Sequence, residues 1–318
     1  MSLDLSQVSV TFLQGKQKIS AVRGVSLSLK KRERIALVGE SGSGKSALAK
    51  TALKLHYRHN TNITGEITLD GKPILETDRG KKIGFVFQDP INALNPTMKI
   101  GKQIAECLPK SRRDEVVKLL QEVKISRPEE RVRQYPHELS GGMCQRVMLA
   151  IALASEPDYL IMDEPTTALD SQTQKDVLDL VLQIQEERGM GILLITHDLN
   201  LAATYTEEIL VMYAGKIVER GPAKTILSHP KHPYTISLIG SIPKKGQKLT
   251  PIPGEPPDPR YLPQGCAFHP RCPKAAPTCK LKEPPAHGKK QLIACYFPDH
   301  DKKPLQELQE QEVPALRT

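Results

Sequence analysis

The sequence predicts an α/β fold built around a phosphate-binding loop, with a helical insertion and an irregular C-terminal extension. Short apolar stretches typical of buried strands recur along the chain, and one of them leads into the glycine-rich segment 39–46. Residues 89–156 change to helical periodicity and contain no strand candidate. From residue 243 the chain becomes proline-rich, which excludes helices and central strands there.

Length and composition limit the possible functions. The chain has 318 residues, 39% of them hydrophobic, which is enough for about two domains with a sizeable core. No apolar run approaches the ~20 residues that span a bilayer, and residues 1–20 lack a signal-peptide core, so we expect a cytosolic chain. The net charge of +9 is modest, and 4% aromatic residues without tryptophan supply few stacking platforms for single-stranded nucleic acid.

Two early segments, 3–12 and 21–29, alternate between apolar and polar residues as strands do. Further apolar runs predict strands over 34–38, 63–69 and 83–87. Phe12 lies shortly before the glycine-rich segment and could stack on an adenine ring or fill a strand core; its position alone favours the core.

Residues 39–46 read GESGSGKS and fit the phosphate-loop pattern G-x-x-x-x-G-K-S/T at every fixed position. Glycines allow backbone N–H groups to converge on an anion, and the following helix adds its positive N-terminus. A glycine-rich turn with a solvated lysine is the alternative, but a strand over 34–38 and a helix over 47–55 provide the context that the motif requires. The predicted nucleotide contacts are Gly39, Ser41, Gly42, Ser43, Gly44, Lys45 and Ser46, with Lys45 on the terminal phosphates and Ser46 on Mg²⁺.

A second candidate anion site follows in the insertion. Ser140 can cap a helix that continues through 147–154, and the glycines after it, including Gly142, leave backbone N–H groups open. An ordinary capped helix is the alternative.

Two later strands end in polar residues that suit phosphate chemistry. The apolar run 159–162 leads into Asp163 and Glu164, and consecutive acids at a strand end are costly unless metal or water uses them. In phosphate-loop enzymes the first acid holds Mg²⁺ and the second orients the attacking water. A further strand over 191–196 ends at His197, which is either structural or a γ-phosphate sensor where parallel strands converge.

The ordered set of motifs resembles the nucleotide-binding subunit of ABC transporters over residues 1 to about 235. It comprises the phosphate loop, Gln88, Leu-Ser-Gly-Gly at 139–142, Asp163-Glu164, Ala168-Leu169-Asp170 and His197. The resemblance implies a phosphate-loop NTPase (RecA-like) core with the antiparallel β subdomain and helical subdomain of the ABC cassette. We therefore divide the chain into a nucleotide-binding domain, 1–240, with its helical subdomain at about 89–156, and an extension, 241–318.

The same resemblance implies residue roles in ATP hydrolysis. It makes Phe12 the adenine-stacking aromatic and Gln88 a residue that touches Mg²⁺ and reports to the transmembrane subunits. It makes Asp163 the acid on the Mg²⁺ side, Glu164 the catalytic base and His197 the switch histidine.

The resemblance also implies a dimer. Ser140 and Gly142 would contact ATP bound by the opposite subunit, and Asp170 would lie in the loop that crosses the dimer interface. Two chains would close face to face around two ATP molecules before hydrolysis becomes fast.

Several motifs are similar to those of the oligopeptide, dipeptide and nickel importer group. They are Phe87-Gln88-Asp89-Pro90, Leu94-Asn95-Pro96 and the segment 163–170. Met143 stands where glutamine is commonest, which in this group marks one of two paralogous ATPases, so we expect a heterodimer. The implied partners are two transmembrane permease subunits and an extracytoplasmic substrate-binding protein, with this chain peripheral on the cytoplasmic face of the inner or plasma membrane. Peptides are the favoured cargo; nickel or another small solute stays open.

Four of the six cysteines cluster in the extension, with the spacing C-x5-C-x6-C-x15-C. In a cytosolic chain such a cluster favours metal ligands over disulfides. Four thiolates suit Zn²⁺ or a [4Fe–4S] cluster, and the spacing does not choose between them. The run 265–273 resembles the extension of peptide-importer ATPases, which implies an iron–sulfur cluster on Cys266, Cys272, Cys279 and Cys295; reduced thiols without metal are the alternative.

Two other function classes agree less well with the sequence. A soluble ABC ATPase acting on nucleic acid or ribosomes would carry long coiled coils, zinc modules or a second cassette, and none of these is evident here. A non-catalytic cassette disagrees with the intact Lys45, Asp163, Glu164 and His197.

Overall fold

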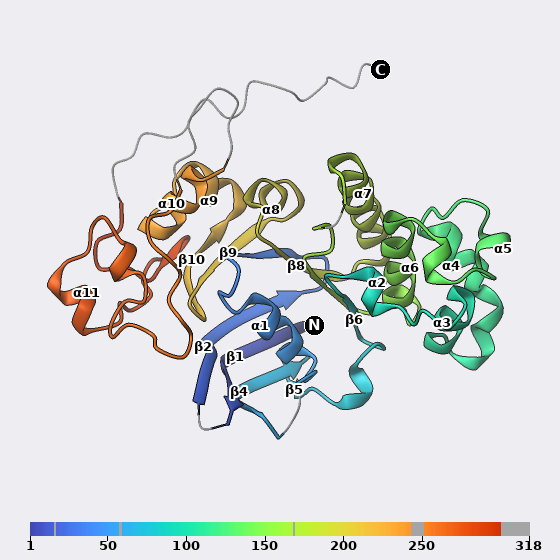
Figure 1. Ribbon diagram of the computed structural model, residues 1–318, viewed down its shortest axis with the longest axis horizontal. Helices are drawn as coiled ribbons and strands as arrows, with labels where there is room; N and C mark the ends of the chain where they lie inside the picture. Colours follow the sequence, from blue (N-terminus) through green and yellow to red (C-terminus); the bar gives the residue numbers. More distant parts are fainter. Residues whose placement is uncertain (16, 57–58, 168, 243–250, 300–318) are drawn as a thin grey trace, which may run out of the picture.

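The fold consists of two β-sheets, a helical lobe and a C-terminal extension that packs on the edge of the larger sheet (Figure 1). It is seen in a computed structural model that describes residues 1–15, 17–56, 59–167, 169–242 and 251–299. The α/β fold class predicted from the sequence is confirmed.

The smaller sheet is antiparallel, with the strand order β2-β1-β4-β5. Its strands are β1 (Ser2–Gln14), β2 (Gln17–Lys30), β4 (Thr61–Leu69) and β5 (Lys72–Pro73). Alternation between apolar and polar residues puts one face of β1 and β2 into a core and leaves the other face to water.

The larger sheet has the strand order β11-β10-β9-β3-β8-β7-β6. Its strands are β3 (Arg34–Val38), β6 (Ile83–Val86), β7 (Tyr159–Asp163), β8 (Gly191–Thr196), β9 (Glu208–Tyr213), β10 (Lys216–Pro222) and β11 (Leu292–Ile293). Pairing is parallel from β9 to β6 and antiparallel at β10 and β11. The central strands are buried throughout, as expected for parallel strands covered on both faces.

Helices supply the remaining layers. The α-helices are α1 (Lys45–Ala52), α2 (Pro90–Ala93), α3 (Ile100–Cys107), α4 (Val116–Glu122), α5 (Pro128–Arg131), α6 (Gly141–Leu153), α7 (Ser171–Arg188), α8 (Leu199–Tyr205), α9 (Ala223–Ser228), α10 (Pro233–Gly240) and α11 (Pro277–Leu281). The short 3-10 helices are η1 (Glu76–Asp78), η2 (Lys110–Glu115), η3 (Pro136–Glu138) and η4 (His269–Arg271). Within the described part of the chain, none of the helices has the length and apolar character needed to cross a membrane.

The helical lobe matches the insertion predicted from periodicity. Residues 89–156 are all described and contain helices, turns and no strand. Apolar residues of α3, α4 and α6 pack against apolar residues of β6 and β7 in one core. The lobe is therefore joined to the sheet by shared packing.

Strand order brings the predicted motifs to one edge. The neighbouring strands β3, β8, β7 and β6 run parallel, so their carboxyl ends meet. The phosphate loop follows β3, His197 follows β8, Glu164 follows β7 and Gln88 lies two residues beyond β6. Ligands bind at such edges in open α/β sheets.

The extension was predicted to be irregular, and most of residues 251–299 are. Three short regular elements nevertheless occur in this range: the 3-10 helix η4, the single turn of α11, and β11, which pairs with β10. Phe268 is buried and lies edge-on to Tyr213 and Tyr234, with ring centroids 5.2 and 5.4 Å away. The extension thus shares a core with β9 and α10.

This shared core predicts that the extension stabilises the whole fold. Phe268→Ala should lower the free energy of unfolding by about 3 to 5 kcal/mol, because it leaves a cavity among buried rings. Denaturant unfolding followed by circular dichroism measures this. Leu281→Ala, at a side chain that is 66% exposed, serves as the control and should change little. An unfolding midpoint of Phe268→Ala equal to that of the wild type would contradict the shared core.

Candidate functional site

The phosphate loop connects β3 to α1 and is tightly packed against its neighbours. A Cβ atom on Gly44 would lie 2.1 Å from the Ala21 carbonyl oxygen, and one on Gly39 would lie 2.2 Å from the Met212 carbonyl oxygen. Gly44 also has a φ of 104°, in the left-handed region, and is the residue directly before α1. Only glycine satisfies both requirements at this position.

Lys45 is the buried cation of the site. Its side chain is 4% exposed, and its Nζ donates to the carbonyl oxygens of Gly39 (2.8 Å) and Glu40 (3.1 Å). Burial lowers the pKa of Lys45, while Glu164 and Asp163 oppose that effect. A buried ammonium held only by carbonyl oxygens and nearby acids is well suited to receive phosphate oxygens.

Ser46, Asp163 and Gln88 line one pocket, together with Lys50, Phe87, Asp89, Asn92 and Ala93. The Ser46 hydroxyl donates to Asp163 Oδ1 at 2.9 Å, and Asp163 is buried. Burial raises the pKa of Asp163, and the hydrogen bond from Ser46 opposes it. Hydroxyl, carboxylate and amide oxygens are the ligands that Mg²⁺ prefers, so this donor set fits the predicted magnesium ion.

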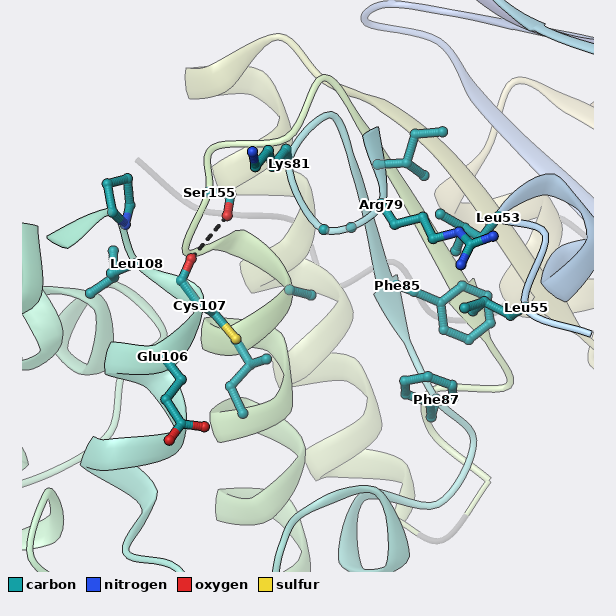
Figure 2. A pocket seen from close by; sticks show the side chains of 16 residues that line it. Leu53, Leu55, Arg79, Lys81, Phe85, Phe87, Glu106, Cys107, Leu108 and Ser155 are labelled. Carbon is teal, nitrogen blue, oxygen red and sulfur yellow. Dashed lines mark hydrogen bonds between the residues drawn. The ribbon is translucent and has the colours of Figure 1, made fainter. Parts of the chain in front are cut away.

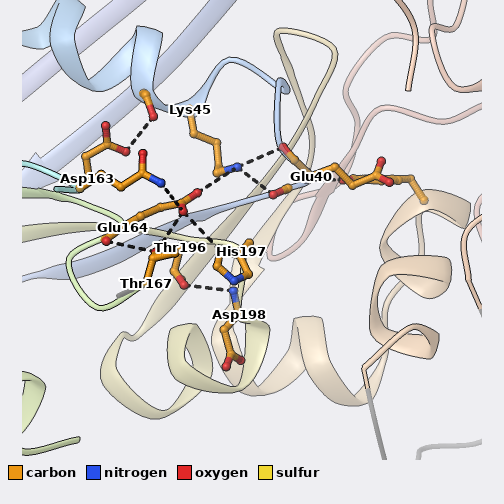
Figure 3. Close-up of polar contacts among 12 residues, drawn as sticks. Glu40, Lys45, Asp163, Glu164, Thr167, Thr196, His197 and Asp198 are labelled. Carbon is orange, nitrogen blue, oxygen red and sulfur yellow. Dashed lines mark hydrogen bonds and ion pairs between the residues drawn. The ribbon is translucent and has the colours of Figure 1, made fainter. Parts of the chain in front are cut away.

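Glu164 is the point on which the polar side chains converge (Figure 3). Its Oε2 accepts from Gln88 Nε2 at 3.2 Å and from the Thr167 hydroxyl at 3.1 Å, and lies 3.4 Å from His197 Nδ1. Its Oε1 lies 3.9 Å from Lys45 Nζ. The structure thus brings together four residues that the sequence identified separately, and adds Thr167.

The backbone of Glu164 is strained. Its φ of 47° lies in the left-handed region, which side chains of this kind rarely adopt. The amide N–H of Glu164 donates to the Ile195 carbonyl of β8 at 2.9 Å, which holds this conformation. Strain retained at one acidic residue beside a buried lysine is typical of functional sites.

Phe12 lies near the end of β1 and is half-buried. Its ring meets the His56 ring edge-on, with centroids 5.3 Å apart. His56 in turn contacts the Thr51 hydroxyl (2.7 Å) at the end of α1. One part of this aromatic side chain faces the core, as its position in the sequence favoured, and another part remains accessible.

Ser140, Gly142 and Asp170 gather at the starts of α6 and α7. The Ser140 hydroxyl caps α6 by accepting from Met143 N (3.3 Å), as predicted. A Cβ on Gly142 would lie 2.9 Å from Thr173 Cγ2, and Thr173 donates its hydroxyl to Asp170 at 2.6 Å. Hydrogen bonds from Thr173 and from backbone N–H groups lower the pKa of Asp170.

The start of α6 lies in the helical lobe, whereas the phosphate loop leads into α1. Figure 1 shows α6 in the helical lobe, separated from α1 by β6 and α2. Ala168, part of the predicted Ala168-Leu169-Asp170 motif, lies outside the described residues.

The sequence did not indicate one residue of α10 that contacts the phosphate loop. The Tyr234 hydroxyl, from α10, accepts from the backbone N–H of Glu40 at 2.9 Å. No motif surrounds Tyr234, and only its complete burial in the tertiary structure marks it. Thr167, in contrast, lies inside the recognised acidic segment and could have been identified there.

The four cysteines of the extension line one small cavity together with His232 and Phe268. All four are free thiols. Burial raises the pKa of the Cys266 and Cys272 thiols, and that of Cys295 to about 11.

The predicted metal or iron–sulfur site has its four cysteines around one cavity, but they are not arranged as a set of metal ligands. Among the residues that the structure describes, no three His, Cys, Asp or Glu side chains converge as metal ligands. The thiolate is the metal ligand, and free thiols carry no charge that would draw them around a common point.

An apolar groove lies between the helical lobe and the outer strand of the sheet (Figure 2). One wall carries Phe85 and Phe87, whose rings are 4.6 Å apart, and the exposed Leu55. The other wall carries Cys107 and Leu108. Phe87 also lines the pocket of Ser46, Gln88 and Asp163, so the groove and that pocket share a wall.

Comparison with known proteins agrees with this geometry. The sequence model of the ABC transporter family matches residues 22–167, and that of the oligopeptide/dipeptide transporter C-terminal region matches residues 218–279. The ATP-binding cassette MJ0796, solved as a dimer bound to ADP and phosphate, is 30% identical with a TM-score of 0.62. That similarity covers 70% of this chain and 99% of the solved one.

Curated relatives extend the match over most of the chain. The dipeptide transport ATP-binding protein DppD of Bacillus subtilis is 43% identical over 87% of this chain and 88% of its own length. The oligopeptide transport ATP-binding protein OppD of Lactococcus lactis subsp. cremoris is 45% identical over 80% of each. OppD of Mycobacterium tuberculosis is 42% identical over 89% of this chain, which spans 49% of that longer protein. The chain belongs to the ABC transporter family, within the group of oligopeptide and dipeptide transport ATP-binding proteins.

Proposed function

We propose that this chain is the ATP-hydrolysing subunit of a membrane importer for peptides. The observation that carries the proposal is the convergence of Gln88, Thr167, His197 and Lys45 on Glu164, at the sheet edge beside the phosphate loop. A carboxylate held in this way, close to a buried lysine, is suited to orient water at a terminal phosphate.

ATP would bind along the phosphate loop. Its phosphate oxygens would replace the carbonyl oxygens of Gly39 and Glu40 as partners of Lys45. The loop residues Gly39, Ser41, Gly42, Ser43 and Gly44 would supply backbone N–H groups, and Phe12 would contact the adenine through its accessible part. Ser46, Gln88 and Asp163 would hold Mg²⁺, which neutralises charge on the phosphates when bound.

Hydrolysis would depend on Glu164 as the general base. Its Oε2 is held by Thr167 and Gln88, which orients the carboxylate toward Lys45. His197 would sense the γ-phosphate from the end of β8, and its position 3.4 Å from Glu164 supports that role. Loss of the γ-phosphate would remove the contacts that hold the site closed.

A second subunit would complete the site. Ser140, Gly142 and Asp170 lie together at two helix starts, where they would contact ATP bound by a neighbouring chain. The dimeric state of the similar cassette MJ0796 supports this arrangement. We propose a paralogous ATPase as the partner, on the evidence of Met143 in the signature.

The apolar groove would receive a helix of a permease subunit. Phe87 and Leu55 are 40% and 41% exposed. Exposed apolar side chains that line one groove favour a protein partner. Because Phe87 is shared with the Gln88 pocket, movement in the groove would reach the nucleotide directly. The chain would thus lie peripherally on the cytoplasmic face of the inner or plasma membrane, against two permease subunits.

Peptides are the proposed cargo, delivered by an extracytoplasmic binding protein. The names of the relatives DppD and OppD support peptides over nickel or another small solute. They give no support to the alternative of a soluble ATPase acting on nucleic acid or ribosomes.

We further propose that residues 1–240 form the nucleotide-binding domain and residues 241–318 an extension with a metal centre. Four thiols around one cavity are the donor set of a [4Fe–4S] cluster or of structural zinc. Either group would supply the positive charge that turns the thiols into thiolates, and would join the turns that carry them.

Lys45→Ala should weaken ATP binding by about tenfold or more, because it removes a charge-assisted contact to the phosphates. Equilibrium titration with a fluorescent ATP analogue measures the affinity. Lys54→Ala is the matched control, since the Lys54 ammonium donates to the Ile74 carbonyl, away from the loop. Unchanged affinity in the Lys45 variant would contradict the placement of ATP.

Glu164→Gln should reduce ATP turnover by at least about a hundredfold, because the amide cannot accept a proton from water. ATP affinity should be retained, and the variant should accumulate as a closed dimer with its partner subunit in ATP. Phosphate release and size-exclusion chromatography measure the two effects. Turnover like that of the wild type would show that Glu164 is not the base.

Protein purified without oxygen should contain iron and inorganic sulfide in equal amounts. Cys272→Ser should lose both, whereas Cys107→Ser, in the helical lobe, should keep them. Elemental analysis and a sulfide assay give the result. Stoichiometric zinc without sulfide would select the zinc alternative, and neither metal would refute the metal centre.

A further inference from the structure

Arg271 of the extension reaches the phosphate loop. It ends η4, in the turn between Cys266 and Cys272, and its side chain is 4% exposed. Its two terminal nitrogens bond the two carboxylate oxygens of Glu40, at 2.8 and 3.0 Å. Such a paired contact between guanidinium and carboxylate is strong and strictly oriented.

Other contacts fix the guanidinium before it meets Glu40. Arg271 Nε donates to the Pro253 carbonyl oxygen at 2.8 Å, and one terminal nitrogen also lies 3.3 Å from the Tyr213 hydroxyl. The guanidinium carbon lies 5.9 Å from the centre of the Tyr213 ring. The side chain therefore has a single position, set by the extension and by β9.

Glu40 in turn fixes the loop around Lys45. Its backbone N–H donates to the Tyr234 hydroxyl, and its carbonyl oxygen accepts from Lys45 Nζ and from the N–H of Ser43. The side chain, the N–H and the carbonyl of one residue are thus all occupied. Holding the Glu40 side chain determines where this part of the phosphate loop lies.

We propose that Arg271 is a positioning residue for the phosphate loop, which makes the extension part of the nucleotide site. The inference rests on the proposal that ATP binds at this loop. Arg271 acts in two ways: it holds Glu40 so that the loop is preformed, and it neutralises a carboxylate that would otherwise repel the incoming phosphates.

The motif does not require this pair. Glu40 occupies a variable position of G-x-x-x-x-G-K-S/T, and its partner lies 231 residues farther along the chain. The two residues are nevertheless joined by two hydrogen bonds. They lie at a loop whose backbone N–H groups must be placed accurately to bind phosphate oxygens. The contact therefore adds a long-range support to a local motif.

A double-mutant cycle tests the proposal on the full chain. Arg271→Met should weaken binding of a fluorescent ATP analogue by about tenfold or more, since it removes the support and leaves the Glu40 charge unpaired. Arg271→Lys should lose less, because it keeps the charge without the paired geometry. Glu40→Gln should have a small effect alone, and combining it with Arg271→Met should recover part of the lost affinity.

Glu283→Gln is the matched control. Glu283 also links the extension to the sheets, through Arg23 (2.7 Å) and Lys216, but does not touch the phosphate loop. Its removal should leave ATP affinity within about twofold of the wild type. In steady-state ATP hydrolysis, Arg271→Met should raise KM with little change in kcat, because Glu164 is unaffected.

The outcomes separate the proposals. Wild-type protein that does not bind ATP would overturn the proposed function itself. Wild-type protein that binds ATP, with Arg271→Met binding equally well, would overturn only the positioning role; so would an equal loss in Glu283→Gln, or a fall in kcat at constant KM. If Arg271→Met does not fold, Arg271→Lys decides, because full wild-type affinity in that variant would contradict the need for paired geometry.

Discussion

Parallel pairing of β3, β8, β7 and β6 is the constraint on which the rest of this structure depends. Strands paired in this way end at one edge of the sheet. The backbone pairing therefore brings together residues that are far apart in sequence. The backbone hydrogen bond from Glu164 to Ile195 then ties the turn after β7 to β8. A shift of this pairing by one residue would move the acid away from Lys45.

The charges at that edge stabilise one another in a buried setting. Lys45 and Asp163 are 4% and 3% exposed, and each would be costly to bury alone. Burial lowers the pKa of Lys45 and raises the pKa of Asp163, so it favours the neutral form of each. Neighbouring opposite charges oppose both shifts. The site is therefore held in a state that a triphosphate and a divalent cation can relieve by adding their own charges.

The C-terminal extension packs on the cassette and contacts its phosphate loop. Its apolar residues complete a core against β9 and α10, with Phe268 between Tyr213 and Tyr234. Its polar residues meet the cassette at Glu283 and Arg271. Tyr213 and Tyr234 belong to this core, and their hydroxyl groups also accept hydrogen bonds from Arg271 and from the Glu40 N–H. Packing of the extension is therefore linked to the geometry of the phosphate loop.

The sequence by itself determined the local elements and the residue types of the site. Apolar runs located β3, β6, β7 and β8, and the glycine pattern located the phosphate loop, because strand periodicity and turn geometry are local properties. The helix after the loop begins at Lys45 and ends at Ala52, earlier than predicted, because Leu53 and Lys54 turn away. The apolar run of β9 is a local signal of the same kind.

Only the tertiary structure decided which residues meet. Neither the position of β11 beside β10 nor the bond between Arg271 and Glu40 follows from a motif. Each depends on contacts between distant parts of the chain, and sequence periodicity carries no information about those contacts. The fold supplies them through strand order and through the core that the extension shares with the cassette.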